Sequence, residues 1–196
     1  MPLGSVLSDK NKDEIRVKLK NLCEHHWTEC GYKKTNIKEL CAKVEIGIST
    51  FYALFPTKED LFSETVMDIQ ERLKGKFLDI CKSNPSKEGF ASAMKELFRE
   101  YDEKPFLYDV KNPDYRSFIT KLSSEAMEKI KFDSMEFFRA AINITGLRLQ
   151  VDENIALGVL SAAISIIGAK ETLSITHDYF SIYDFMVDSL VLSVFE

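Results

Sequence analysis

The stretch Thr35–Leu61, TNIKELCAKVEIGISTFYALFPTKEDL, decides the fold, because it carries the signals of successive short helices. Asn36 can cap a first helix, and apolar residues then recur at helical spacing over Ile37–Val44. The apolar pattern breaks at Glu45–Gly47, and a second short helix is predicted over Ile48–Phe55. Two short helices joined by a short turn form a helix-turn-helix.

The second helix is followed by a clear stop and a new start. Pro56 cannot continue a helix and disfavours helical geometry at the residue before it. Thr57 can cap the next helix, with Asp60 in the position of a capping-box partner. From Lys58 onward, apolar residues recur at helical spacing for about six turns, which predicts one long helix.

Helical geometry indicates which side of the second helix faces outward. Phe51 and Phe55 lie one turn apart and must face inward, so Ser49 and Ala53 lie on the opposite side. The flanking residues on that outer side are Thr50 and Tyr52. In a DNA-binding protein such a face would enter the major groove, where hydroxyls bond base edges and an alanine methyl meets a thymine methyl. The alternative is a helical hairpin that serves packing alone.

The same residues resemble the N-terminal DNA-binding domain of TetR-family transcriptional repressors. The matching features are Gly31-Tyr32, Thr35, the Ile37/Leu40/Cys41 pattern, Thr50-Phe51-Tyr52, Phe55-Pro56 and Lys58-Glu59. The resemblance covers roughly residues 10 to 65. It departs from the family at Glu45, where the turn glycine is usual, and at Gly47 and Ile48. The implied DNA contacts are Thr35, Gly47, Ile48, Ser49, Thr50, Tyr52, Ala53 and Lys58.

Composition agrees with a helical, soluble protein of one or two small domains. The chain has 196 residues, and its 8 glycines and 5 prolines are too few for a fold rich in turns. The formal net charge is -5, but residues 1–60 hold 10 basic and 9 acidic side chains. A mildly basic head on an acidic body suits a protein that presents its head to phosphate.

The cysteines indicate neither a disulfide framework nor a metal site. Cys23, Cys30, Cys41 and Cys81 have no paired CxxC spacing, and most fall on apolar helix faces, which predicts free thiols. His25 and His26 fit no zinc-finger spacing. We therefore expect no metal and no cofactor.

The whole pattern predicts an all-α fold. It has a helix-turn-helix domain over 8–68 and a ligand-binding and dimerisation domain over 69–196. Besides the long helix from Lys58, helices are predicted over 10–30, 87–100, 114–131, 133–149, 152–170 and 181–195. By the resemblance, the second domain would hold a small-molecule inducer in a largely apolar cavity. The candidate lining residues are Phe90, Met94, Phe98, Phe118, Phe138, Arg139 and Asn143.

The last two predicted helices indicate a homodimer. Residues 155–169 carry no charge, so they are apolar or small on nearly every side and cannot all face one small core. A second copy of the chain would bury them in a two-fold interface. The expected interface residues are Ile155, Gly158, Ala162, Ser165, Ile182, Phe185 and Leu190.

Three functions remain in competition. The first is a cytoplasmic repressor that leaves double-stranded operator DNA when a ligand binds. The second is an all-helical enzyme or small-molecule carrier, for which the sequence offers no nucleophile motif or acid–base constellation. The third is a helical adaptor with no ligand. Because no such constellation is found, we expect no enzyme activity. The uncharged run 155–169 is shorter than the about 20 residues that a membrane span needs, so we expect no membrane partner.

Overall fold

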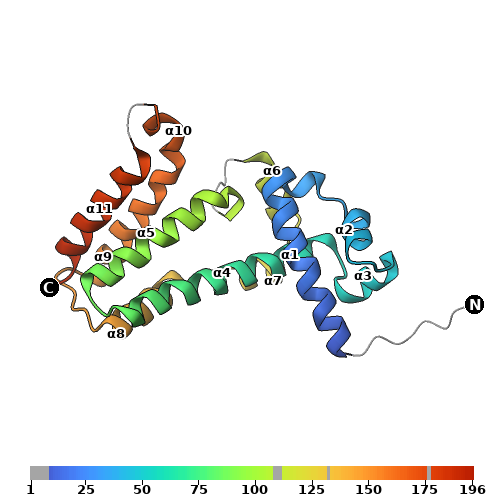
Figure 1. Cartoon of the computed structure of the whole chain (residues 1–196), viewed down its shortest axis with the longest axis horizontal. Coiled ribbons are helices and arrows are strands. Elements are labelled where there is room, and N and C mark those ends of the chain that lie inside the picture. The colour runs from blue at the N-terminus through green and yellow to red at the C-terminus, as the bar shows by residue number, and fades with distance from the viewer. Residues whose placement is uncertain (1–8, 108–111, 132, 176–177) are drawn as a thin grey trace, which may run out of the picture. The chain divides into compact units, whose positions relative to one another are not determined.

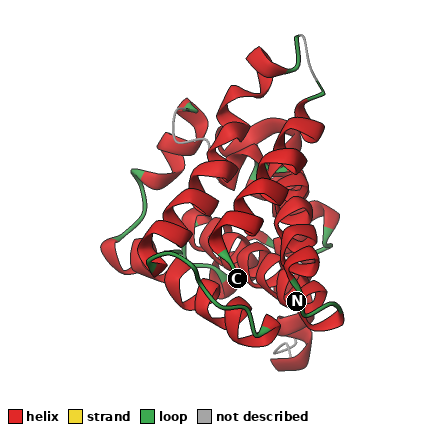
Figure 2. Ribbon diagram, turned by 90° about the vertical axis from the view of Figure 1, so that its left-hand side faces the viewer, coloured by secondary structure: helices red, strands yellow, loops and turns green. Residues whose placement is uncertain are grey.

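The computed structural model of the chain describes residues 9–107, 112–131, 133–175 and 178–196, which fold almost entirely into helices (Figures 1 and 2). Among these residues there is no strand, apart from one isolated antiparallel bridge between Leu149 and Phe195. The all-α prediction is therefore confirmed. The predicted start of the first domain at residue 8 lies outside the described residues.

The helices follow the order expected from the sequence, with differences at their ends. The α-helices are α1 (Asp9–Lys34), α2 (Ile37–Lys43), α3 (Ile48–Leu54), α4 (Lys58–Ser83), α5 (Lys87–Glu103), α6 (Pro113–Ile119), α7 (Ser124–Lys129), α8 (Ser134–Thr145), α9 (Glu153–Ile164), α10 (Lys170–Leu173) and α11 (Tyr179–Val194). The described residues also contain the 3₁₀ turns η1 (Pro105–Leu107) and η2 (Ser165–Ala169).

The helix-turn-helix of α2 and α3 is held by the caps that the sequence predicts. The Asn36 side chain accepts a hydrogen bond from the Lys38 N–H at 2.9 Å at the start of α2. At the start of α4, Thr57 Oγ1 accepts from the Asp60 N–H at 3.0 Å, and Asp60 Oδ2 accepts from the Thr57 N–H at 2.8 Å. Reciprocal bonds of this kind satisfy backbone donors that a helix start leaves free.

The turn between α2 and α3 contains a non-glycine residue in the left-handed region. Glu45 has a φ of 60°, where the side chain crowds its own backbone. Its side chain is exposed, so no burial offsets the strain. The turn thus keeps its geometry without the glycine that would adopt it freely.

Glu45→Gly should raise the free energy of unfolding by about 0.5–1 kcal/mol. The substitution removes the strain of a non-glycine residue in the left-handed region, and this gain exceeds the cost of the extra conformational entropy that glycine gives to the unfolded chain. Chemical denaturation followed by fluorescence of Trp27, the single tryptophan, measures this change. Glu45→Ala is the matched control, because it removes the carboxylate and keeps the strain. Equal stability of the two variants would contradict the backbone explanation.

Two predicted helices are divided by local features, and the first predicted helix, 10–30, is followed by one further turn. This turn, which α1 includes, comes after Gly31, which leaves helical geometry with φ 82° and ψ 170°. The predicted helix 114–131 is wrong as a single element, because the Ser123 side chain caps a new helix by accepting from the Ala126 N–H at 3.1 Å. The predicted helix 152–170 ends as an α-helix at Ile164 and tightens into η2.

The described chain divides into two compact units. The head unit contains the residues up to Ile69 together with Phe106–Lys131, and the body unit contains Gln70–Pro105 and Phe132–Glu196. The sequence had assigned the segment Phe106–Lys131 to the second domain. In the structure α6 packs on α1, so this segment belongs to the head unit.

An aromatic cluster forms the centre of the head unit. The Trp27 ring stacks on Phe106, with centroids 4.6 Å apart, and meets Phe62 and Phe118 at 4.5 and 5.0 Å. The Asp114 carboxylate accepts hydrogen bonds from the backbone N–H groups of Tyr32 and, at 2.8 Å, of Lys33. These contacts explain why α6 joins α1 although more than 80 residues separate them in sequence.

The body unit is built on α5, with α11 packed against both α5 and α9 (Figure 1). Phe98 of α5 and Tyr183 of α11 stack nearly parallel, with ring centroids 3.5 Å apart, and both are fully buried. The inward face of α11 consists of Tyr179, Tyr183, Val187, Val191 and Val194. Aromatic stacking of this kind adds to the area that the rings bury.

The stretch Glu153–Leu173 is the one described segment that is long and apolar enough to cross a membrane, as judged by length and composition alone. Just 22% of its most apolar window is buried within the chain. An apolar helical stretch with so little burial leaves a large part of its surface without a partner in the monomer.

Candidate functional site

The outer face of α3 lies where helical geometry predicts it. Phe51 and Leu54 are buried, whereas Ile48, Ser49, Tyr52 and Ala53 are exposed and Thr50 is half-buried. Gly47, at the cap position, is also exposed. The α3 sequence ISTFYAL contains no charged residue, so the helix itself has no carboxylate that would repel a phosphate backbone.

The position of α3 is fixed by Arg16 of α1, a contact that sequence reasoning missed. Its guanidinium donates to the Leu54 carbonyl at 2.7 Å, at the end of α3, and also bonds Glu64 of α4. It lies over the Phe55 ring at 4.5 Å. No local pattern reveals this role, because the partners are at least 38 residues away in sequence.

Two of the predicted DNA contacts have other roles in the structure. Thr35 is buried, and its hydroxyl donates to the Gly31 carbonyl at 2.8 Å. The Lys58 ammonium donates to the carbonyls of Tyr32 and Thr35 at 2.5 and 2.7 Å, and it lies 4.4 Å from the centroid of the Tyr32 ring. Burial lowers the pKa of Lys58 below its ordinary value.

Both side chains therefore brace the junction between α1 and α2 and do not stand free at the surface. Loss of Lys58 is consequently expected to weaken the packing of the head, and not simply to remove one phosphate contact. Lysines that do project from this part of the head unit are Lys33, Lys34 and Lys38, all exposed. Exposed ammonium groups of this kind can reach the phosphates of a DNA backbone.

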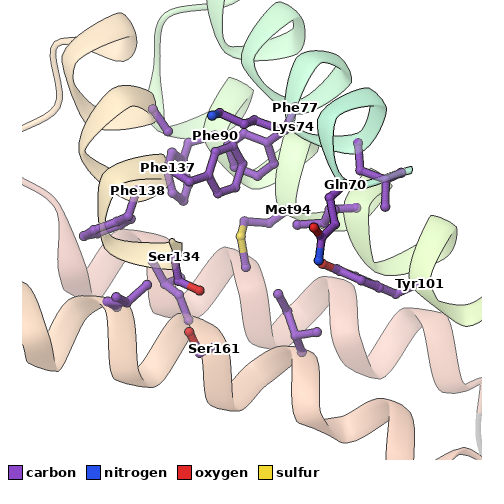
Figure 3. Close-up of a pocket in the computed structure, with 16 residues that line it drawn as sticks. Gln70, Lys74, Phe77, Phe90, Met94, Tyr101, Ser134, Phe137, Phe138 and Ser161 are labelled. Carbon is purple, nitrogen blue, oxygen red and sulfur yellow. The ribbon is translucent and has the colours of Figure 1, made fainter. Parts of the chain in front are cut away.

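The body unit contains an apolar cavity of about 120 Å³ between α4, α5, α8 and α9 (Figure 3). Its lining residues are Gln70, Leu73, Lys74, Phe77, Phe90, Met94, Leu97, Tyr101, Ser134, Phe137, Phe138, Ala141, Leu157, Leu160, Ser161 and Ile164. A cavity of this size is comparable to one that holds a single aromatic ring.

Aromatic and polar groups occupy different parts of the cavity wall. Figure 3 shows the rings of Phe77, Phe90 and Phe137 grouped near Lys74, with Gln70 and Tyr101 together on the other side of Met94. The Lys74 ammonium lies 3.9 Å from Glu71, at the limit of an ion pair. Burial raises the pKa of Tyr101 above its ordinary value.

Sequence analysis identified part of this lining. Phe90, Met94 and Phe138 line the cavity. Phe98 is instead stacked on Tyr183, and Phe118 belongs to the aromatic cluster of the head unit. These two residues are thus core residues, each in a different unit.

Two polar candidates for the cavity are also placed elsewhere. Arg139 is exposed and forms a bidentate pair with Glu153, at 2.8 and 2.7 Å, which lowers the pKa of that carboxyl. Asn143 is exposed and lies outside the lining. The cation beside the cavity is therefore Lys74 and not Arg139. The spacing of Gln70, Lys74 and Phe77 on one face of α4 is the signal that could have identified this wall.

The thiols and histidines of the described residues do not form a metal site. All four cysteines are free, and burial raises the pKa of Cys23 to about 12. Within the described residues, no group of three or more His, Cys, Asp or Glu side chains is arranged to hold a metal ion.

The body unit also presents an uncovered apolar face on α9 and α11. Ile155 of α9 is 57% exposed and Phe185 of α11 is 74% exposed. Gly158, Ala162 and Ser165 are exposed, while Ile182 and Leu190 are half-buried. Leu192 continues the exposed surface on α11. We refer to these residues as the α9/α11 face.

Comparison with known proteins gives a family match within residues 26–65 and a shared fold over most of the chain. Residues 26–65 match the family model described as bacterial regulatory proteins, tetR family. No curated protein matches the chain. A TetR-family transcriptional regulator from Mesorhizobium loti has the same fold, with a TM-score of 0.64 at 13% identity over 93% of this chain and 95% of that one.

Two further solved structures agree over most of the chain. GusR from Salmonella enterica has a TM-score of 0.56 at 18% identity, over 95% of this chain and 98% of its own. The complex of SmeT with triclosan has a TM-score of 0.59 at 15% identity, over 93% of this chain and 92% of its own. SmeT is the repressor of a multidrug efflux pump in Stenotrophomonas maltophilia. At these identities the likeness establishes the fold.

Proposed function

We propose that this chain, which belongs to the TetR family of bacterial regulatory proteins by its N-terminal domain and its fold, is a transcriptional repressor. It binds operator DNA as a homodimer and leaves the operator when a small molecule enters the cavity of the body unit. The observation that carries the proposal is the exposed, uncharged outer face of α3 in a helix-turn-helix whose first helix is capped by Asn36. The protein acts in the cytoplasm and has no catalytic role.

DNA binding is assigned to the outer face of α3 and its cap, Gly47, Ile48, Ser49, Thr50, Tyr52 and Ala53. A gel shift with the DNA upstream of the protein's own gene tests this assignment. The protein should retard that DNA and not a scrambled fragment of equal length. The Tyr52 hydroxyl is assigned to a backbone phosphate, so Tyr52→Phe should weaken binding to all sequences alike. A protein that bound neither fragment would overturn the proposed function.

The ligand is proposed to be small, largely apolar and aromatic or chain-like, with an anionic or hydrogen-bond-accepting end. The phenylalanine rings of the cavity favour the apolar part. Lys74, whose nearest carboxylate stands at 3.9 Å, favours the anionic end. The binding of triclosan by SmeT, a repressor of the same fold, supports a ligand site in a body of this kind.

Lys74→Met should weaken the binding of benzoate, a single-ring aromatic anion that matches the size of the cavity, by about tenfold or more, because a charge-assisted hydrogen bond contributes roughly 1.5–3 kcal/mol. Isothermal titration calorimetry measures the affinity. Lys82→Met is the matched control, since Lys82 lies on the same helix but pairs with Asp79 outside the cavity. An equal effect of the two substitutions would contradict a direct role for Lys74.

The homodimer is proposed to form through the α9/α11 face. A two-fold arrangement would place α9 and α11 of both copies in one four-helix bundle. The small residues Gly158, Ala162 and Ser165 allow a partner helix to approach closely, and Phe185 supplies a large apolar anchor. Such an obligate interface should bury at least about 2,000 Å². It also sets the spacing of two half-sites, which lie about one DNA turn, roughly 34–36 Å, apart.

A further inference from the structure

The outer face of α3 lacks the side chains that proteins most often use to recognise guanine and adenine. Its sequence ISTFYAL contains no Arg, Lys, Asn or Gln, the residues that form bidentate hydrogen bonds with those bases. The exposed members are Ile48, Ser49, Tyr52 and Ala53. Direct reading of sequence by this helix therefore depends on single hydroxyl bonds and on contacts made by methyl groups.

Ile48 is the large aliphatic side chain of this face, and 41% of it is exposed at the first residue of α3. Because it is branched at Cβ, it occupies few rotamers and holds its methyl groups in fixed positions. The preceding residue, Gly47, has no side chain, and a Cβ built there would meet just the Ser49 hydroxyl, at 3.6 Å. The backbone beside Ile48 can thus approach a partner surface closely.

We propose that Ile48 is a specificity-determining residue that packs against the C5-methyl group of a thymine in each operator half-site, an inference that rests on the DNA-binding function proposed above. The thymine methyl is the apolar group that base pairs present in the major groove. Phosphate contacts carry no sequence information, so short-range contacts to the base edges must supply the selectivity.

The experiment has to distinguish the contribution of Ile48 to base preference from that of a neighbouring acidic residue, Glu45. Glu45 is exposed in the turn before α3, and a carboxylate can accept a hydrogen bond from the amino group of cytosine. Binding sites are therefore selected from a random pool of double-stranded DNA with the full chain and, in parallel, with Glu45→Gly. A preference that persists in both selections does not come from Glu45.

Deoxyuridine then replaces each thymine of the selected site in turn, which removes one methyl group and keeps every hydrogen-bonding group. At one thymine in each half-site, the replacement should weaken binding about fourfold, the factor for one buried methyl-sized group. The same replacement should have no effect on Ile48→Ala, because the contact is already lost. The difference between the deoxyuridine effect on the unsubstituted protein and on Ile48→Ala is the coupling between Ile48 and that thymine. This coupling should stay constant between about 50 and 200 mM salt, since a methyl contact releases no counterions.

Val17→Ala is the matched control, because Val17 is also an exposed apolar residue of the head unit but lies on α1. This variant should keep the full deoxyuridine effect. Selected sites in which no thymine couples to Ile48 would overturn the inference and leave the proposed DNA binding intact. A selection that enriches no sequence at all would overturn the proposed function as well.

Discussion

Ala162→Glu should leave the protein monomeric and weaken operator binding about 10²–10⁴-fold, because two linked heads bind far more tightly than one. Ala162 lies on the α9/α11 face between Gly158 and Ser165, at the point where a partner helix would approach. A carboxylate there would lose its water without gaining a partner, at a cost of roughly several kcal/mol per ion. Analytical ultracentrifugation and a gel shift on the same sample measure both effects.

Because Ala162 is exposed in the single chain, the substituted protein should keep its fold, which circular dichroism can verify. Ser92→Glu is the matched control, since it places the same charge at an exposed position of α5 outside the α9/α11 face. The control should remain dimeric. Phe185→Ser should reproduce the monomer by removing an apolar anchor instead of adding a charge. A dimer that persisted in both Ala162→Glu and Phe185→Ser would place the interface elsewhere.

Gly31→Ala should destabilise the head unit by about 2–5 kcal/mol, the sum of backbone strain and lost hydrogen bonds. Its φ of 82° with ψ of 170° lies in a region that essentially glycine alone adopts. A Cβ at this position would stand 2.7 Å from Asp114 Oδ2, the atom that accepts the Tyr32 N–H. Denaturation followed by Trp27 fluorescence reports on this unit directly.

Gly146→Ala provides a matched comparison. Gly146 also has a positive φ, 66°, but a Cβ there would meet no atom within 4 Å. Its cost should be about 1–2 kcal/mol, the strain of a left-handed residue alone. Combining Gly31→Ala with Asp114→Ala should cost less than the sum of the two single changes, because the clash and the lost hydrogen bonds share one carboxylate. Strict additivity would show that Asp114 does not restrain the backbone at Gly31.

The sequence predicted those parts of the fold that depend on neighbouring residues. The starts of α2 and α4 depend on Asn36 and Thr57, whose partners lie two and three residues away. The outward direction of Tyr52 follows from helical spacing alone. Local capping residues and helical spacing were therefore sufficient to predict both the position of the helix-turn-helix and its outer face.

Roles that depend on distant partners could not be predicted in this way. Arg139 carries a charge in a region where a cavity was expected, but its partner Glu153 lies 14 residues away on the next helix. Phe90 and Phe98 occupy one face of α5, yet Phe90 lines the cavity and Phe98 stacks on Tyr183. Helical periodicity separates inside from outside. It does not distinguish a packed interior from a cavity wall.

The return of the chain to the head unit at Phe106–Lys131 has a practical consequence for work on fragments. A truncated protein that ended after the long helix begins, near residue 68, would contain the whole helix-turn-helix but would lack Phe106, Phe118 and Asp114. Trp27 would lose two of its three ring neighbours, and the backbone donors of Tyr32 and Lys33 would lose their acceptor. A minimal DNA-binding module of this protein would need that later segment supplied in the same polypeptide, joined by a designed linker.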